Sequence, residues 1–94
     1  MNRAYIVWYE TGEYDDKVDM VVALFASKKS ADRFVRKYND ILESYNCHWG
    51  YSTSYDKADE CAEKIQKELK LDYFCIEATT GGKFRVSLPM KIQP

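Results

Sequence analysis

The sequence predicts an α+β domain in which a four-stranded antiparallel sheet carries two helices on one face. Two segments near the N-terminus alternate like strands, two central segments have apolar residues at helical spacing, and the last third alternates again. The expected order is therefore β-β-α-α-β-β. A chain of 94 residues has room for a single domain, residues 1–94.

The first predicted hairpin comprises residues 4–9 and 18–26, joined by the polar segment 10–17. Side chains of the first strand alternate between one face with Ala4, Ile6 and Trp8 and another with Tyr5, Val7 and Tyr9. Pairing Trp8 with Met20 makes the first face wholly apolar, so we expect it to meet the helices. The face left over is more apolar than a solvated sheet face, and it carries Tyr5, Val7, Tyr9, Val21 and Phe25.

Two helices are predicted in the middle of the chain. Ser27 is a natural N-cap for a helix over about 28–45, and either Ser54 or Asp56 can cap a second helix. The first helix has a regular apolar stripe of Ala31, Phe34, Val35, Tyr38, Ile41, Leu42 and Tyr45. The second has a narrower stripe of Ala58, Cys61, Ala62, Ile65 and Leu69.

A second hairpin is predicted from residues 73–79 and 84–92. A two-residue Gly81-Gly82 loop would place Glu77 on the buried face, which is costly. A three-residue loop, 80–82, instead pairs Phe74 with Leu88 and sets Glu77 opposite Arg85. Pro89 cannot donate a ladder hydrogen bond, so the last strand is expected at an edge of the sheet.

Charge and composition exclude several classes of protein. The formal net charge of -1 is unlike the basic balance of a dedicated nucleic-acid-binding domain. No stretch approaches the roughly 18 apolar residues that a bilayer-spanning helix needs. The N-terminus lacks the features of a signal peptide, and three widely spaced cysteines do not suggest a disulfide framework. We therefore expect a cytoplasmic protein with free thiols.

Neither catalysis nor metal binding is indicated. Cys47 beside His48 is the only pairing of a nucleophile with a histidine base, and adjacent residues of a strand point apart. Zinc sites usually contain a close pair of cysteines, which this sequence lacks. The Gly81-Gly82-Lys83 run joins two strands rather than a strand and a helix, so it is not a phosphate loop. We expect no enzyme activity, no metal and no cofactor.

Two candidate binding surfaces remain. The leftover aromatic face is covered within the chain, meets another copy or a partner protein, or forms a groove for a small ligand. Combined with the acidic segment after it, this face gives a candidate partner site of Tyr5, Tyr9, Glu13, Tyr14, Asp15, Asp16 and Phe25. The alternative function is a homodimer that binds a nucleotide or another small anion through Arg33, Arg36 and Lys37; these cations are otherwise a solvated helix face.

One resemblance adds to these expectations. Tyr5-Ile6-Val7, Asp15-Asp16 and the run Ala23-Leu24-Phe25-x-Ser27-x-x-x-Ala31-x-x-Phe34-Val35 resemble small domains of phages and mobile elements in which a β-hairpin runs into a helix. The resemblance covers about residues 4–38 and contains no catalytic motif. It implies an accessory protein that binds and blocks a host protein, such as a CRISPR effector. The leading expectation is thus a non-enzymatic protein-binding module acting as a phage-type inhibitor of a host protein.

Overall fold

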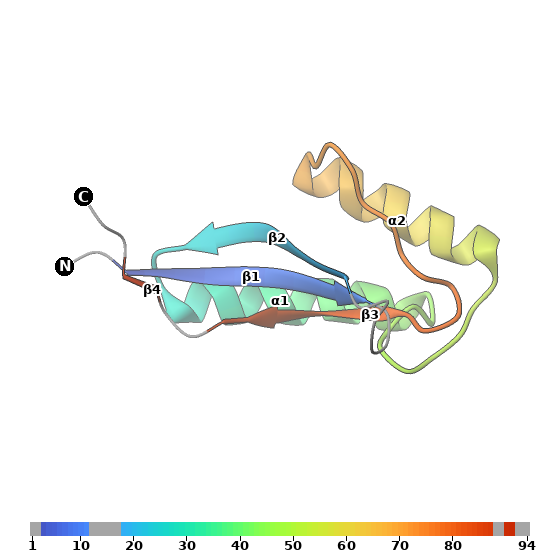
Figure 1. The fold of residues 1–94 in the computed structure, drawn as a ribbon, viewed down its shortest axis with the longest axis horizontal. Coiled ribbons are helices and arrows are strands. Elements are labelled where there is room, and N and C mark those ends of the chain that lie inside the picture. The colour runs from blue at the N-terminus through green and yellow to red at the C-terminus, as the bar shows by residue number, and fades with distance from the viewer. Residues whose placement is uncertain (1–2, 12–17, 88–89, 92–94) are drawn as a thin grey trace.

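The computed structural model describes residues 3–11, 18–87 and 90–91 of the chain. The protein is α+β, and Figure 1 shows the elements in the order β-β-α-α-β, followed by a two-residue strand, which is roughly the expected β-β-α-α-β-β. They are β1 Arg3–Thr11, β2 Val18–Phe25, α1 Lys28–Ser44, α2 Tyr55–Leu69, β3 Gly82–Val86 and the two-residue β4 Met90–Lys91.

The sheet has three full strands in the order β2-β1-β3, all antiparallel. Strand β1 is central, and β4 pairs only with Arg3 and Ala4 at its start. The predicted four-stranded sheet built from two hairpins is wrong, because β3 pairs with β1 and no strand forms over 73–79. Strand β3 does lie at an edge, as expected, although Pro89 itself is outside the described residues.

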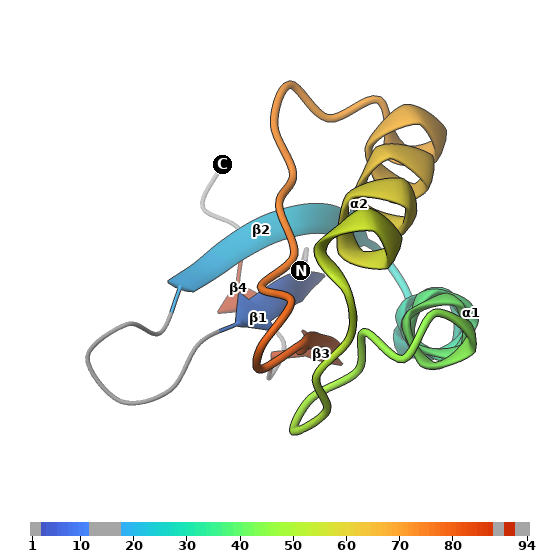
Figure 2. The ribbon, with the colours of Figure 1, turned by 90° about the vertical axis from the view of Figure 1, so that its right-hand side faces the viewer.

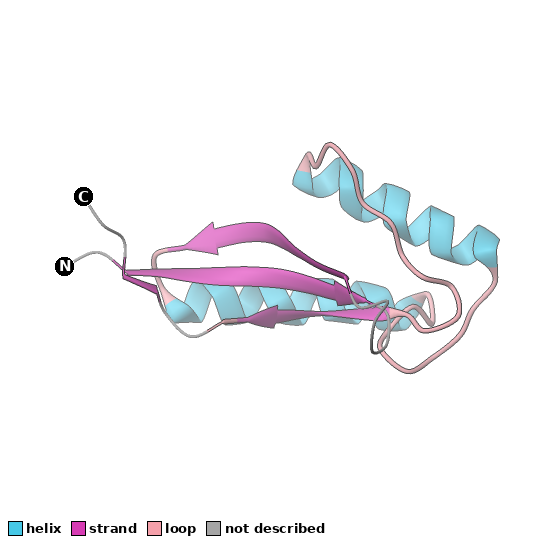
Figure 3. Cartoon of the chain, viewed as in Figure 1, coloured by secondary structure: helices cyan, strands magenta, loops and turns pink. Residues whose placement is uncertain are grey.

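Residues 73–77, here called the extended segment, have no strand partner and lead into a turn over 78–80; both are drawn as a pink loop in Figure 3. Their side chains alternate as predicted, since Phe74, Ile76 and Ala78 are buried and the residues between them are exposed. The segment is held by its buried side chains and by the Thr53 N–H, which donates to the Ala78 carbonyl at 2.8 Å. The alternating sequence pattern therefore predicted correctly which side chains are buried, but it did not predict which strands pair. The expected pairing of Glu77 with Arg85 does not form.

The register between β1 and β2 also differs from the expected one. Tyr9, not Trp8, lies opposite Met20, and an irregularity between Val7 and Trp8 leaves one extra residue in β2. Consequently the face of β1 that carries Val7 and Tyr9 points into the core, where these side chains are 0% and 2% exposed. The prediction that this face is left over is wrong.

Helix α1 covers that inner face of the sheet, as Figure 2 shows. An aromatic cluster joins the two layers, with the ring of Tyr38 5.9 Å from that of Phe84 and the ring of Phe34 5.3 Å from that of Phe25. Helix α2 lies on the same side of the sheet but packs beside α1 and the extended segment rather than across the strands. The expected arrangement of both helices on the sheet face thus holds for α1 only.

Both helices begin where the sequence predicts. The Ser27 hydroxyl accepts from the Ser30 N–H at 3.1 Å, and the Ser54 hydroxyl accepts from the Lys57 N–H at 3.2 Å. Each bond satisfies one backbone donor that the first helical turn leaves free. The two caps therefore set where α1 begins after β2 and where α2 begins after the 46–54 segment.

Asn39 of α1 closes part of the outer edge of β3. Its side-chain amide donates to the Phe84 carbonyl at 3.0 Å and its carbonyl oxygen accepts from the Phe84 N–H at 2.8 Å. The amide thereby imitates a neighbouring strand at one position. This residue was not singled out in the sequence, where a polar residue within an apolar helical stripe is the only signal.

Replacing Asn39 with alanine is expected to destabilise the fold by about 1–3 kcal/mol, because two part-buried backbone groups of Phe84 lose their partners. Urea unfolding followed by circular dichroism measures the change. Asp40→Ala, at an exposed position on the same helix, is the control and should change stability by less than about 0.5 kcal/mol. Equal losses in the two variants would contradict the role given to the amide.

Candidate functional site

The candidate site is the face of the sheet turned away from α1, here named the outer face. In the register observed, Trp8 pairs with Val21 and Arg85, and Glu10 pairs with Asp19 and Lys83. Residues directly opposite one another share a face. The outer face therefore consists of Ala4, Ile6, Trp8, Glu10, Asp19, Val21, Leu24, Lys83 and Arg85.

The centre of the outer face is apolar and open. Leu24 is 63% exposed and Val21 is 45% exposed, while Ile6 and Trp8 are half-buried. None of these four side chains belongs to the described hydrophobic core. Figure 2 shows that both helices lie on the opposite side of the sheet. Contiguous apolar side chains left uncovered in this way mark interaction surfaces more often than scattered ones do.

One border of the outer face carries an organised group of charges. The Glu10 side chain is only 6% exposed, and it forms an ion pair with Arg85 and a longer one with Lys83, at 3.9 Å. The guanidinium of Arg85 also lies over the Trp8 ring, 5.5 Å from its centroid. Arg85 is thus held between a carboxylate and an aromatic ring, so it presents a cation in a fixed position beside the apolar centre.

The structure separates the residues of the predicted partner site. Tyr5, Tyr9 and Phe25 lie on the inner face, where Tyr5 and Phe25 pack against the core and Tyr9 is buried within it. Burial raises the pKa of the Tyr9 phenol well above its usual range. Glu13, Tyr14, Asp15 and Asp16 lie outside the described residues. The aromatic half of the predicted site is therefore mainly structural.

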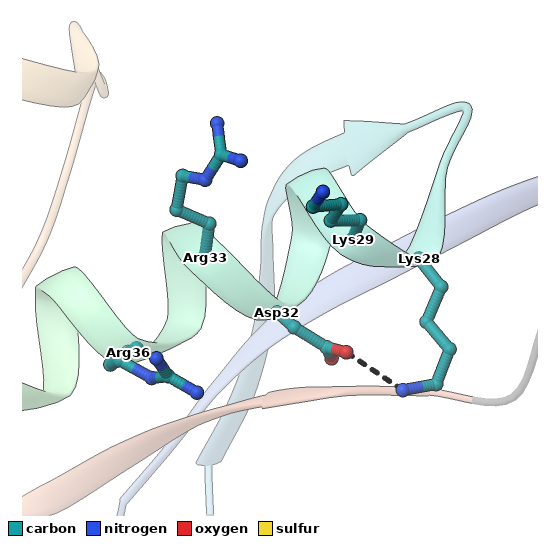
Figure 4. Close-up of a pocket in the computed structure, with 5 residues that line it drawn as sticks. All are labelled: Lys28, Lys29, Asp32, Arg33 and Arg36. Atoms are coloured by element: carbon teal, nitrogen blue, oxygen red, sulfur yellow. Dashed lines mark hydrogen bonds and ion pairs between the residues drawn. The ribbon is translucent and has the colours of Figure 1, made fainter.

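The predicted anion site is brought together in part. Arg33 and Arg36 line an open depression of about 530 Å³ with Lys28, Lys29 and Asp32. Figure 4 shows Lys28 and Asp32 turned toward each other, 2.7 Å apart, while Arg33 projects away from them. Lys37 is not part of this depression, because its ammonium lies 3.8 Å from Glu68 of α2.

A second, smaller cavity of about 110 Å³ lies beside the inner face. Sites for small organic ligands usually have volumes of about 300–1,000 Å³, so this one is too small for a nucleotide. It is lined by Tyr9, Thr11, Met20, Tyr73, Cys75 and Glu77. The groove that the aromatic face was expected to form as one alternative is therefore no more than a small void between that face and the extended segment.

The two buried thiols, Cys47 and Cys61, are poorly suited to nucleophilic chemistry. Burial raises the pKa of the Cys61 thiol to about 12, and it also raises the pKa of Cys47. Cys47 interacts with the Cys61 thiol and with the Tyr45 carbonyl, at 3.5 Å, rather than with the ring of His48. The His48 ring lies on that of Tyr51, with 3.9 Å between centroids. Within the described part of the chain, no group of three or more metal-ligating side chains is present.

The comparisons with known proteins give no assignment. No family model, curated protein or solved structure matches this chain. Over the residues that the structure describes, no helix combines the length and apolar character required to cross a bilayer. The outer face and the charges at its border are therefore the features of this chain that bear on its function.

Proposed function

We propose that this protein is a non-enzymatic protein-binding module whose contact surface is the outer face. The observation that carries the proposal is the open apolar centre formed by Ile6, Trp8, Val21 and Leu24, with Leu24 63% exposed. Covering it with another protein would remove apolar surface from water, which is the main favourable contribution to most associations.

The composition of the outer face also favours a protein partner over a small molecule. Protein interfaces combine an apolar centre with a polar border, and tryptophan and arginine are prominent among the residues that contribute most to affinity. Here Trp8 and Arg85 contact each other next to that centre. The surface is a sheet face rather than an enclosed cavity, so it suits a partner with a broad apolar patch and an acidic group near Arg85.

Leu24→Asp tests this proposal. Because Leu24 is largely exposed, the variant should keep its fold, but a carboxylate at the centre of the interface should weaken partner binding by more than tenfold. Proteins recovered from a cell lysate on immobilised wild-type and variant proteins are compared by quantitative mass spectrometry.

Tyr55→Asp is the matched control, because Tyr55 is also a large exposed side chain, 74% exposed, but begins α2. A protein that is retained by the wild type and by Tyr55→Asp, yet lost with Leu24→Asp, supports the outer face as the binding surface. Identical recovery with all three proteins would show that this face is not used.

The resemblance over residues 4–38 implies that such binding inhibits a host protein. A partner captured through the outer face would then lose its activity in the complex. The alternative, nucleotide or anion binding by Arg33, Arg36 and Lys37, has less support. Lys37 lies apart from the two arginines, and among the described residues that line the depression there is no aromatic side chain on which a base could stack.

A further inference from the structure

The two edges of the sheet differ in how much of their backbone is already occupied. At the β3 edge, Asn39 pairs with both backbone groups of Phe84. The Gly82 N–H donates to the Cys47 carbonyl at 2.9 Å, and His48 forms a parallel bridge to the same glycine. Side chains and the 46–48 segment therefore close this edge to another strand.

Among the residues that the structure describes, none covers the β2 edge in this way. Apart from its bonds to β1, strand β2 makes no hydrogen bond to any of the residues that the structure describes. Seven of its eight residues, VDMVVALF, are apolar, and it contains no lysine, arginine or proline. Natural edge strands are usually protected by such residues or by a covering element. At about 3.3 Å per residue, β2 offers an open edge of roughly 26 Å.

The charges at the two ends of β2 indicate what covers it. Asp19 lies exposed near the start of the strand, opposite Glu10, whose carboxylate already interacts with Arg85 and Lys83. The other end leads through residues 26–27 into Lys28 and Lys29 at the start of α1. The cations there exceed the carboxylates, since Lys28, Lys29, Arg33 and Arg36 line the same depression as Asp32, the one carboxylate among its described lining residues (Figure 4).

Because of this charge difference between its two ends, β2 of one copy is complementary to β2 of a second copy only when the two strands run antiparallel. When two copies of β2 run antiparallel, the exposed Asp19 at the start of each strand lies toward the cation-rich end of the other. A parallel pairing would instead bring the two cation-rich ends together. Opposite charges across an interface favour encounter and fix its register, and a twofold axis repeats every such contact.

We propose that β2 pairs antiparallel with β2 of a second copy of this chain, giving a twofold homodimer with one continuous sheet. In this dimer Asp19 of each copy lies near Lys29 of the other, and the two outer faces join into one surface. The edge is formed by backbone groups of β2, whereas the outer face is a set of side chains on three strands, so this inference does not rest on the proposed function.

The test is the mass of the purified protein in solution, measured by light scattering over a range of concentrations. The wild type should approach twice the chain mass of 11.0 kDa as the concentration rises. Asp19→Lys and Lys29→Glu should each raise the dissociation constant of the dimer roughly tenfold, because each reversal replaces attraction by repulsion at two symmetric positions. The double variant should restore most of the wild-type affinity.

Neither single variant should harm the monomer. Asp19→Lys removes a like-charge pair with Glu10, and Lys29→Glu places an acid in the first turn of α1, where the helix dipole favours one. Lys57→Glu is the matched control, because it makes the same change in the first turn of α2 and should leave dimerisation unaffected.

Two results would overturn the proposal. One is a wild-type protein that stays monomeric up to about 1 mM, which would leave the edge to a different partner. The other is a dimer whose dissociation constant is the same in the wild type and in both single reversals, since the contact would then lie elsewhere. Recovery in the double variant after loss in each single variant identifies antiparallel β2 pairing.

Discussion

Replacing Gly81 with alanine is expected to destabilise the fold by about 3–5 kcal/mol, a large part of the roughly 5–15 kcal/mol available to a domain of this size. A Cβ atom at this position would lie 2.7 Å from the Cys47 carbonyl oxygen and closer still to that of His48. Both neighbours are backbone atoms and cannot rotate away. Gly81 also has φ +68°, a conformation that costs other residues roughly 1–2 kcal/mol.

Gly50→Ala separates these two contributions. Gly50 has φ +85°, but no heavy atom lies within 4 Å of a Cβ built there. The Gly50→Ala variant should therefore lose only the stability that the unfavourable backbone conformation costs, about 1–2 kcal/mol. Urea unfolding of the two variants and the wild type gives both numbers. Equal losses would mean that the close approach of Gly81 to the 47–48 backbone contributes nothing.

Replacing Phe84 with alanine is expected to cost about 3–5 kcal/mol. The side chain is 2% exposed, and its ring contacts those of Tyr9 at 5.0 Å, Tyr38 at 5.9 Å and Phe74 at 6.1 Å. These three partners come from β1, α1 and the extended segment. Removal of the ring therefore leaves a cavity where three parts of the fold meet.

Thermal and urea unfolding measure this loss. Tyr55→Ala is the control, since its ring is 74% exposed and should change stability by less than about 0.5 kcal/mol. A decrease of less than 1 kcal/mol for Phe84→Ala would contradict the central place of this ring in the core. A native near-ultraviolet circular dichroism spectrum of the wild type provides the reference for aromatic packing.

The sequence was sufficient to predict the helices and the first two strands, because local features determine them. Helix α1 was expected over 28–45 and extends over Lys28–Ser44, with the Ser27 cap in place. Strands expected over 4–9 and 18–26 are observed as Arg3–Thr11 and Val18–Phe25. Periodicity and caps depend on neighbours within a few residues, so a single sequence contains them.

The strand pairing in the last third of the chain could not be predicted, because it depends on residues that are distant in the sequence. Phe74, Ile76 and Ala78 alternate with exposed residues whether or not their backbone joins a sheet, so the pattern is the same for a strand and for an extended segment. The strand pairing is instead determined by a long-range contact, because β3 pairs with β1, which is far away in the sequence. The close approach of Gly82 to the Tyr9 ring, with no room for a Cβ atom, is part of that pairing.

The sequence led to the wrong choice of which face of β1 is covered, because both faces are apolar. With Trp8 on one face and Tyr9 on the other, composition alone does not indicate which one the helix covers. The extra residue in β2 shifts the register by one, and nothing local, such as a glycine, marks it. Arg85 gave a usable signal, since a cation directly opposite Trp8 indicates a face that meets water, but only once the β1–β3 register is known.

The position of β1 between two neighbours has a consequence for synthesis on the ribosome. Glu10 and Arg85, which interact in the finished protein, are 75 positions apart. At about 5–20 residues per second, roughly 4–15 s pass between their appearances. Hairpins and helices form within microseconds, so β1 and β2 have time to pair while β3 is still absent. For those seconds the nascent sheet lacks Phe84, one of the rings that pack on Tyr9 in the finished protein.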